Sequence, residues 1–418
     1  MSAEHAHMPS APLTMWLRGG TCTWVRTCAL MLICSFLGGC ADALRPTSTP
    51  NGTVMPGVKV LTYNILHGLE PSGLTVKASE SKQAREARLA LQFRQLAEIQ
   101  PDVMLLQEVN PLPEMVRKYV TAVKGFGLQY AEVHQVDACG VRLAPGLAVV
   151  PGLNNGLAVL AKAPLVVRKV RGLKLSGGFG HCHTYMGFQT GELRYALIAE
   201  IEHPSTGTKF LTVNVHLHSG IGRSAFFLQK INEAVEEGKV RREDFDGIVA
   251  AIEQNQERRL NEIRVLLKEI DKLNTEGTYR GVLVGGDFNF EPDDPEYREL
   301  ERAGLKDTHA MGSPETELYT FDPQRNVLAG RGVRAVPATL RTAMKRLPKS
   351  LQKKLLEGYQ QGMSEARRID FLFLMTPPSH VPTGCFRQEL FGHHDADSDP
   401  GSDHYGVLVT YIADATQC

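Results

Sequence analysis

Apolar segments that stop abruptly on polar residues constrain the fold of this chain more than any other feature. The segment from Gly281 to Phe290, GVLVGGDFNF, reaches two glycines and then presents Asp287 and Asn289. A short aliphatic run bounded by glycine and charged residues predicts a buried β-strand. We expect the two glycines to let the chain turn sharply at the strand end. Asp287 and Asn289 would then lie at the edge of a sheet instead of inside its core.

Five further strand-like segments also carry polar residues at one end, with helical patterns and a hairpin signal, PSTG, between them. One helical pattern covers SKQAREARLALQFRQLAEIQ, and another runs from about Ile252 to Leu273. The polar strand-end residues are Asn64, Glu108, His216, Asp287 with Asn289, Asp370, and Asp403 with His404. The irregular alternation of strands and helices predicts an α+β fold with mixed sheets, not a doubly wound parallel sheet.

These strand-end residues would form a cluster of carboxylates and imidazoles if the fold brings them together. Each one, taken singly, is more often an exposed surface residue. Clustered carboxylates repel one another, and a bound divalent cation relieves that repulsion. Oxygen ligands predict Mg²⁺, with Mn²⁺ or Ca²⁺ as alternatives, rather than zinc. A Mg²⁺ site beside a carboxylate and a histidine is suited to hydrolysis of a phosphate ester, whose transition state accumulates negative charge on oxygen.

Seven motifs in order resemble the signatures of the endonuclease/exonuclease/phosphatase superfamily, which has the deoxyribonuclease I-like fold. The resemblance extends from about Val58 to Ile412, over the motifs YNIL, LLQEV, GLAVLAKAP, VNVHLHS, GGDFN, RIDFLF and SDHYGV. The combination of GGDFN with a terminal SDH is its most specific part. The resemblance implies a four-layer α/β/β/α sandwich whose active site lies where the strand ends of two sheets meet.

The resemblance also implies which residues hold the metal. Glu108 would be the principal Mg²⁺ ligand, with Asn64 beside it and Asp403 near the metal. His67 is a departure, because some relatives place an acidic ligand close to this position; we expect a non-ligand role for it. A second cation could be held by an acidic tract, although a solvated polar loop is the preferred interpretation of its residues Asp395, Asp397 and Asp399.

The remaining strand-end residues would act on the phosphate and the water. Asp287 would orient and deprotonate the attacking water, and Asn289 would hold either the scissile phosphate or Asp287. His404 would bind and neutralise a phosphate oxygen, while Asp370 fixes its tautomer and orientation. His216 would contact the phosphate from the other side.

The first residues have the pattern of a bacterial export signal. Arg18 and Arg26 precede the apolar run CALMLICSFLGG, which is too short to span a membrane as a stable helix. The segment LGGC resembles a bacterial lipobox, in which Cys40 is lipidated after cleavage. An ordinary secretory signal and a membrane anchor are the alternatives. Translation from Met15 would give a signal of ordinary length.

These patterns predict the organisation of the chain. A lipoprotein signal peptide would cover 1–39, a Pro/Ser/Thr-rich tether 40–57, and a single catalytic domain 58–418. The domain would carry insertions near 220–246 and 325–368. In an oxidising compartment, four cysteines permit two disulfides in three connectivities, and they are Cys139, Cys182, Cys385 and Cys418. No spacing among these cysteines predicts a structural zinc site.

Charge is balanced overall but not locally. Lys plus Arg and Asp plus Glu each number 46, so no overall field recruits nucleic acid or an anionic membrane. The segment 325–368 nevertheless holds eleven Lys/Arg against two acids, and it is interrupted by Pro348. Apolar residues recur in it at helical spacing, namely Leu340, Met344, Leu347, Leu351 and Leu355. The segment would either contact an anionic surface or substrate, or pack its leucines on the domain as a solvated helix.

The motifs and the export signal together predict a monomeric, Mg²⁺-dependent phosphodiesterase of the bacterial cell envelope, anchored to the membrane through Cys40. Aromatic residues make up only 7% of the chain, and it has no basic, aromatic-rich stripe of the kind that binds single-stranded nucleic acid. We therefore expect a phospholipid headgroup, as in the bacterial sphingomyelinase branch, or a small phosphodiester as substrate. The alternatives are an extracytoplasmic DNA or RNA endonuclease and a binding lipoprotein without turnover.

Overall fold

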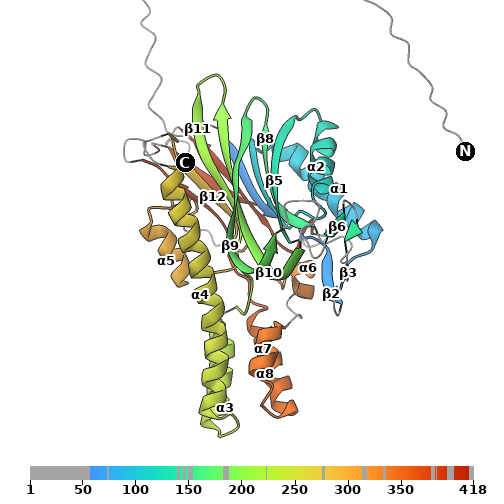
Figure 1. The fold of residues 1–418 in the computed structure, drawn as a ribbon, viewed down its shortest axis with the longest axis vertical. Coiled ribbons are helices and arrows are strands. Elements are labelled where there is room, and N and C mark those ends of the chain that lie inside the picture. Colours follow the sequence, from blue (N-terminus) through green and yellow to red (C-terminus); the bar gives the residue numbers. More distant parts are fainter. Residues whose placement is uncertain are drawn as a thin grey trace, which may run out of the picture. The chain divides into compact units, whose positions relative to one another are not determined.

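Two six-stranded mixed β-sheets face each other, and helices cover their outer faces (Figure 1). Residues 50–418 form one compact unit. The computed structural model describes residues 57–72, 75–138, 142–144, 147–148, 154–181, 188–222, 224–274, 278–312, 318–332, 336–377, 382, 384–392 and 400–413. The expected α+β architecture with two packed sheets is confirmed.

The first sheet has the strand order β15-β16-β1-β4-β8-β5, in which only β1 and β4 pair in parallel. Its strands are β1 Lys59–Asn64, β4 Val103–Gln107, β5 Tyr130–Ala138, β8 Asn155–Lys162, β15 Cys385–Phe391 and β16 Gly406–Ile412. Its outer face is covered by α1 Lys82–Ile99 and α2 Glu114–Lys124. The Ser81 side chain caps α1 by accepting from the Ala84 amide, and the buried Leu89 and Leu96 confirm the predicted apolar face.

The second sheet has the strand order β13-β14-β12-β11-β10-β9, in which β11 and β12 are the parallel pair. Its strands are β9 Val166–His181, β10 Phe188–His203, β11 Thr208–His216, β12 Val282–Asp287, β13 Lys306–Asp307 and β14 Asp370–Met375. The predicted hairpin is β10 and β11. The outer face of this second sheet is covered by α4 Arg242–Leu273 and α5 Pro295–Arg302. Two short ribbons complete the strands: β2 Leu69–Ser72 with β3 Thr75–Ala78, and β6 Arg142–Ala144 with β7 Leu147–Ala148.

The two glycines of β12 allow close packing and do not form a turn. The strand continues through both of them to Asp287, so the expected sharp turn at the glycines is wrong. A Cβ on Gly285 would lie 2.6 Å from Leu105 of the facing sheet, and a Cβ on Gly286 would overlap the Val215 carbonyl. The chain turns after Asp287, where Asn289 has a φ of 56°. Glycine therefore brings the sheets together at the strand that carries Asp287.

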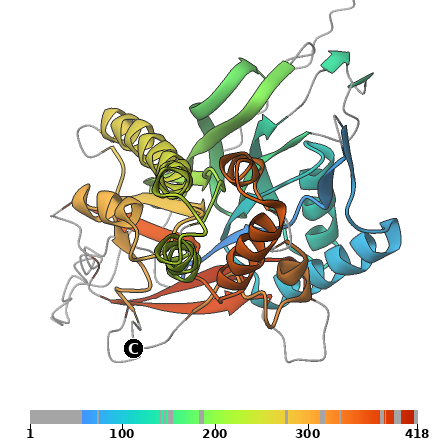
Figure 2. The ribbon, with the colours of Figure 1, turned by 90° about the horizontal axis from the view of Figure 1, so that it is seen from below.

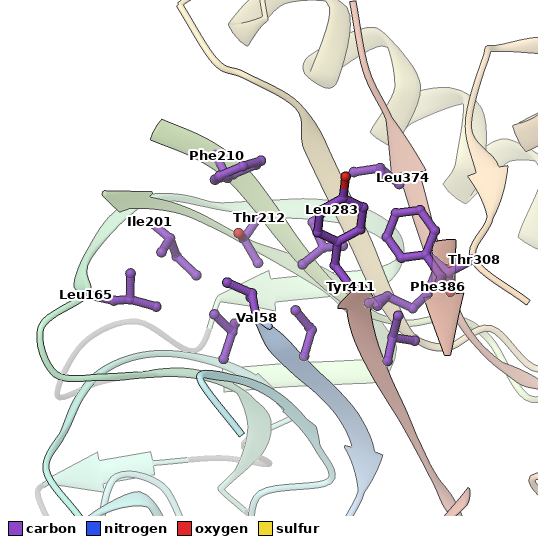
Figure 3. A pocket seen from close by; sticks show the side chains of 14 residues that line it. Val58, Leu165, Ile201, Phe210, Thr212, Leu283, Thr308, Leu374, Phe386 and Tyr411 are labelled. Carbon is purple, nitrogen blue, oxygen red and sulfur yellow. The ribbon is translucent and has the colours of Figure 1, made fainter. Parts of the chain in front are cut away.

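The space between the sheets is filled by aliphatic and aromatic side chains. A small cavity of about 70 Å³ remains there, and its walls include Val58, Leu283 and Leu374 (Figure 3). These residues lie at the ends of their strands opposite to Asn64, Asp287 and Asp370. The cavity is thus an apolar space in the core, distant along the strands from the polar residues.

The two predicted insertions fold into helices that pack on one another (Figures 1 and 2). They comprise α3 Ala225–Glu236, the first turns of α4, α6 Val327–Gly332, α7 Ala338–Ala343 and α8 Lys349–Gly362. Pro348 is the N-cap of α8 and separates it from α7, as expected. Leu340, Met344, Leu347 and Leu355 are buried against residues of α3 and α4. The apolar residues of segment 325–368 therefore pack on the domain, which is one of the two interpretations given for them.

Helix α4 begins at Arg242, ten residues before the predicted start, because its first turns cover the insertion helices as well as the sheet. Within the described residues, none of the helices is both long and apolar enough to span a membrane.

Candidate active site

The polar strand ends converge at one edge of the two sheets. On the second sheet, Asp287 of β12 lies in register between His216 of β11 and Asp370 of β14. On the first sheet, Asn64 ends β1 and Glu108 directly follows the neighbouring parallel strand β4. Five residues from five separate motifs are thereby brought to one place by sheet register and sheet packing.

Asp287 is the centre of this cluster and is only 2% exposed. Asn64 Nδ2 donates to Asp287 Oδ2 at 3.0 Å, and the Asn289 amide donates to Oδ1 at 3.1 Å. His216 Nε2 lies 3.4 Å from Oδ2. Asn289 thus holds Asp287 through its backbone, while its side chain donates to the Leu217 carbonyl at 3.1 Å.

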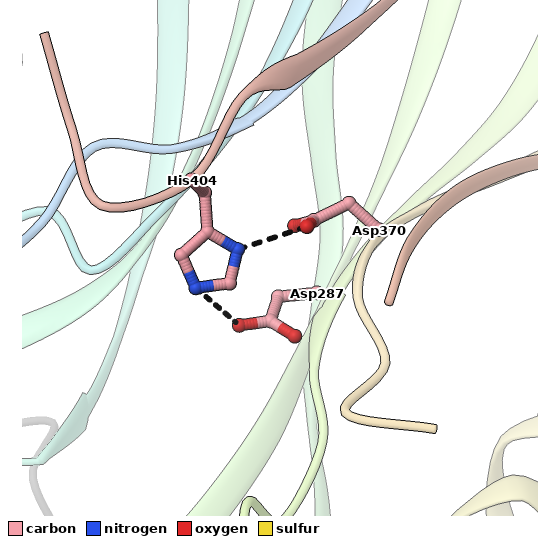
Figure 4. Close-up of side chains that lie close together, drawn as sticks. All are labelled: Asp287, Asp370 and His404. Carbon is pink, nitrogen blue, oxygen red and sulfur yellow. Dashed lines mark hydrogen bonds and ion pairs between the residues drawn. The ribbon is translucent and has the colours of Figure 1, made fainter. Parts of the chain in front are cut away.

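His404 lies between two carboxylates (Figure 4). Its Nδ1 is 2.8 Å from Asp370 Oδ2 and its Nε2 is 3.8 Å from Asp287 Oδ2. Thr320 Oγ1 accepts from the Asp370 amide at 3.0 Å and fixes the start of β14. Burial lowers the pKa of His404, but Asp370 and Asp287 raise it by more, so that it lies well above the usual value. The ring is an imidazolium at neutral pH.

Glu108 lies on the other side of Asn64. It has a φ of 57°, and its side chain is 15% exposed. It accepts from Asn64 Nδ2 at 3.2 Å and from the His67 amide at 2.9 Å. Burial raises the pKa of Glu108, but the His67 ring and the hydrogen bond from the His67 amide lower it to about 2. Glu108 is ionised at any physiological pH and is aimed at the space shared with Asn64.

His67 and Asp403 flank Glu108. His67 Nδ1 accepts from the Leu69 amide at 2.9 Å, and its Nε2 lies 3.6 Å from Glu108 Oε2. Ser402 Oγ donates to Asp403 Oδ1 at 3.2 Å. Burial, and to a smaller extent the Glu108 charge, raises the pKa of Asp403. His67 Nδ1 is thus occupied by a backbone amide, and the non-ligand role of His67 stays a prediction.

The charge of the site fits a bound cation. Burial raises the pKa of Asp287 to about 7, and the Asp370 and Glu108 charges add to this effect while His404 opposes it. The Glu108 charge also acts on Asp403, and carboxylate oxygens are the donors that Mg²⁺ favours. Asn64 turns its amide nitrogen toward the carboxylates, and its assignment as a metal ligand stays a prediction.

A second set of donor atoms is closer together. Oxygens of Asp287 and Asp370 and a nitrogen of His404 lie within 4.8 Å of one another, close enough to hold a metal ion. One imidazolium lies between these two carboxylates and can balance only one of their two negative charges. The position of the cation beside Glu108 therefore stays a prediction.

His216 differs from His404 in its charge. Burial and the Arg194 guanidinium lower the pKa of His216 well below the usual value. Its Nδ1 is buried and has no partner among the described residues. A neutral His216 and a charged His404 therefore flank Asp287.

Ion pairs brace the site, and no sequence pattern predicted them. Arg194 pairs with Glu192 at 2.6 Å, and Arg258 pairs with Glu192 at 3.0 Å. Arg88 on α1 pairs with Glu80 at 2.6 Å and donates to the carbonyl of Ile65 at 2.7 Å, just beyond Asn64. No local pattern marks such pairs, because their partners are set by tertiary contacts.

A cleft of about 790 Å³ leads from the cluster to the insertion helices. His404 and Asn289 lie on the side of the sheets. Another part of the lining comes from α8 and the segment that follows it, and includes Tyr359, Met363 and Arg367. The insertions therefore shape the space that a substrate enters.

Some predicted residues lie outside the described part of the chain. They are the signal and tether with Cys40, the acidic tract Asp395, Asp397 and Asp399, and Cys139, Cys182 and Cys418. Cys385, the first residue of β15, is disulfide-bonded. The connectivity of the cysteines stays a prediction.

Residues 61–404 match the family model described as the Endonuclease/Exonuclease/phosphatase family. No curated protein matches the chain. Similar solved structures include truncated TDP2 from Caenorhabditis elegans, with 15% identity, a TM-score of 0.48, and coverage of 85% of this chain and 97% of that one. Another is a mannosyl-6-phosphatase from Bacteroides thetaiotaomicron, with 14% identity, a TM-score of 0.47 and coverage of 85% and 99%.

The family match includes the strand-end residues from Asn64 to His404, which the fold gathers into one cluster. The chain therefore belongs to the endonuclease/exonuclease/phosphatase family, whose members hydrolyse phosphoester bonds.

Proposed function

We propose that this hydrolase is a divalent-metal-dependent phosphodiesterase in which Asp287 activates the attacking water. The observation that carries the proposal is the position of Asp287, buried between Asn64 and the imidazolium of His404. A general base works best when its pKa lies close to the working pH, and burial raises the pKa of Asp287 to about 7. The Asn289 amide and Asn64 fix its two oxygens, so the base has a defined direction.

The histidines supply the phosphate contacts. His404 carries a positive charge, held by Asp370, and offers it to an anionic phosphate oxygen on the cleft side. His216 is neutral and lies beside Asp287, so it contributes a hydrogen bond instead of a charge.

Glu108 and Asp403, with Asn64 adjacent, would hold Mg²⁺, or Mn²⁺ or Ca²⁺ in its place. The ion, when bound, neutralises charge on the phosphate and favours the ionised form of nearby carboxylates. The depressed pKa of Glu108 supports this assignment, because a ligand must be deprotonated to bind.

The substrate in this proposal is a small phosphodiester or a phospholipid headgroup at the cell envelope. The support for the location is the lipobox-like segment before Cys40 and the apolar run that precedes it. A binding lipoprotein without turnover would not need Glu108, Asp287 and His404 to converge, whereas here they do.

The first test is hydrolysis of bis(p-nitrophenyl) phosphate by the purified mature chain. We expect turnover that requires Mg²⁺, stops with EDTA and is abolished in Asp287→Ala. The matched control is Asp246→Asn, which neutralises an exposed aspartate on α4 and should hydrolyse at the wild-type rate. Absence of turnover with every divalent cation would refute the enzyme assignment.

Substrate class and location need separate measurements. Plasmid DNA and sphingomyelin vesicles are offered to the same preparation; nicking without release of phosphocholine would favour the endonuclease. For the anchor, labelling with radioactive palmitate in a bacterial host should mark the wild-type chain and not Cys40→Ser. An unlabelled wild-type chain would exclude lipidation.

A further inference from the structure

Arg367 occupies a fixed position beside the phosphate-binding histidine. Its backbone pairs with Phe321 on both sides, with the Arg367 amide donating at 2.8 Å and the Phe321 amide donating at 3.0 Å. The guanidinium lies 5.1 Å from the centre of the Phe321 ring. That ring packs edge-on against His404 with centroids 5.2 Å apart. One aromatic ring thus separates the guanidinium from the imidazolium.

The charge of Arg367 is not neutralised by an ion pair within the described residues. Its Nε is buried without a partner, and its Nη1 contacts only the Met363 sulfur at 3.9 Å, which is a weak acceptor. Burial lowers the pKa of Arg367, yet an arginine remains protonated at neutral pH. Arg258, which also lines the cleft, is by contrast paired with Glu192 at 3.0 Å.

Three carboxylates act on Arg367 from a distance. The charges of Glu291, Asp287 and Glu365 raise its pKa in opposition to burial, but among the described residues none of them forms an ion pair with the guanidinium. Asp287 is already bonded by Asn64 and Asn289. Arg367 therefore lines the cleft with a guanidinium whose Nε has no hydrogen-bond partner among the described residues.

The surroundings of Arg367 favour an anionic ligand. Tyr359, Met363 and Pro337 give the same wall an apolar character, which strengthens an ion pair formed there. A guanidinium binds phosphate oxygens through two parallel hydrogen bonds. The quaternary ammonium of a choline headgroup would be repelled by it. The cleft of about 790 Å³ has room for more than the scissile phosphate.

We infer that Arg367 is a specificity-determining residue that selects phosphodiesters carrying a second phosphate group near the scissile one. The inference rests on the proposed phosphodiesterase function and narrows its substrate class. It favours a phosphorylated headgroup or phosphorylated small diester over phosphocholine esters. Arg367 determines which ester binds, while the strand-end residues hydrolyse the ester bond.

Two matched substrate pairs test the inference and separate the sources of the second phosphate. One pair is glycerophosphoinositol with and without a 4-phosphate, and the other is a thymidine dinucleotide with and without a 5′-terminal phosphate. We expect the wild-type chain to prefer the phosphorylated member of at least one pair by tenfold or more in kcat/KM, mainly through KM. Arg367→Gln should reduce that ratio to about one, and Arg367→Lys should retain part of it.

The control is Lys345→Gln, which removes an exposed positive charge from the same insertion outside the cleft and should leave the ratio unchanged. Near-ultraviolet circular dichroism verifies that each variant is folded. A wild-type preference that survives in Arg367→Gln, or no preference in either pair, would overturn the inference. If bis(p-nitrophenyl) phosphate itself is not hydrolysed, the proposed function fails instead.

Binding gives a readout that does not depend on turnover. In calorimetry with Mg²⁺ present throughout, the wild-type chain should bind inorganic pyrophosphate at least tenfold more tightly than inorganic phosphate. Arg367→Gln should bind the two with similar affinity. Equal affinities in the wild-type chain would count against a second phosphate site at Arg367.

Discussion

Replacement of Asp287 by asparagine should make the metal-free protein more stable, and increasingly so as pH rises. The Asp287 side chain is 2% exposed, and burial raises its pKa from 3.8 to about 7. The folded state therefore binds this proton more tightly than the unfolded state does. Stability from this group is fully present below pH 3.8 and is lost as pH rises toward 7. An asparagine keeps the shape without carrying that charge.

The size of the effect follows from the shift. A shift of roughly three pKa units corresponds to about 4 kcal/mol above pH 7, and to about 2 kcal/mol at pH 5. For a folded unit of about 370 residues, the entropy of unfolding is about 0.8 kcal/mol/K, so 4 kcal/mol raises the melting temperature by about 5 °C. The advantage of Asp287→Asn should thus grow from about 2 °C at pH 5 to about 5 °C at pH 8.

The assay is thermal unfolding in EDTA at pH 5 and pH 8, followed by far-ultraviolet circular dichroism or calorimetry. Asp246→Asn, on the exposed face of α4, is the control and should show no pH-dependent difference from wild type. Mg²⁺ should reduce the difference in melting temperature between Asp287→Asn and the wild type, because a nearby cation favours the ionised form of Asp287. A variant that is less stable than wild type at pH 8, or an advantage that does not change with pH, would refute the reasoning.

Three further variants test other parts of the fold and site. Glu108→Gln should raise the Mg²⁺ concentration needed for half-maximal hydrolysis at least tenfold, measured by metal titration; an unchanged requirement would place the cation elsewhere. Asp370→Asn should lower the pKa of His404, so the alkaline limb of the pH–rate profile should move to lower pH; an unmoved limb would contradict the pairing. Gly285→Ala should destabilise the chain by about 1–3 kcal/mol in urea unfolding, because its Cβ would press on Leu105; unchanged stability would show that the sheets can separate there.

The strand ends were predictable from sequence because two local signals coincide in them. An aliphatic run marks the buried strand, and a polar residue such as Asp287 or Asp370 marks the point where the strand leaves the core. Their convergence, by contrast, depends on sheet register, which pairs Asp287 with both neighbours. The family motifs supplied that information, since no local pattern encodes which strands become neighbours.

Other features could not be predicted because their causes are tertiary. The glycines of β12 indicated a turn, whereas Gly285 is required by Leu105 on a strand about 180 positions earlier. The leucine pattern of the basic insertion fitted two interpretations equally. Only the presence of Phe227 and Ile231 of α3 against Leu355 decides that its apolar face is covered. Charge pairs such as Arg88 with Glu80 likewise leave no periodic trace.

Selection of the substrate and cleavage of the bond depend on different parts of this structure. The cluster around Asp287 is held by the two sheets, while the described residues of the insertion helices pack around a hydrophobic core of their own. The wall that carries Tyr359 and Met363 belongs to those helices. A substitution in α8 can therefore alter the cleft without displacing the strands that position Asp287 and His404. It follows that substitutions in the insertion should change which esters bind more than they change the rate at which a bound ester is hydrolysed.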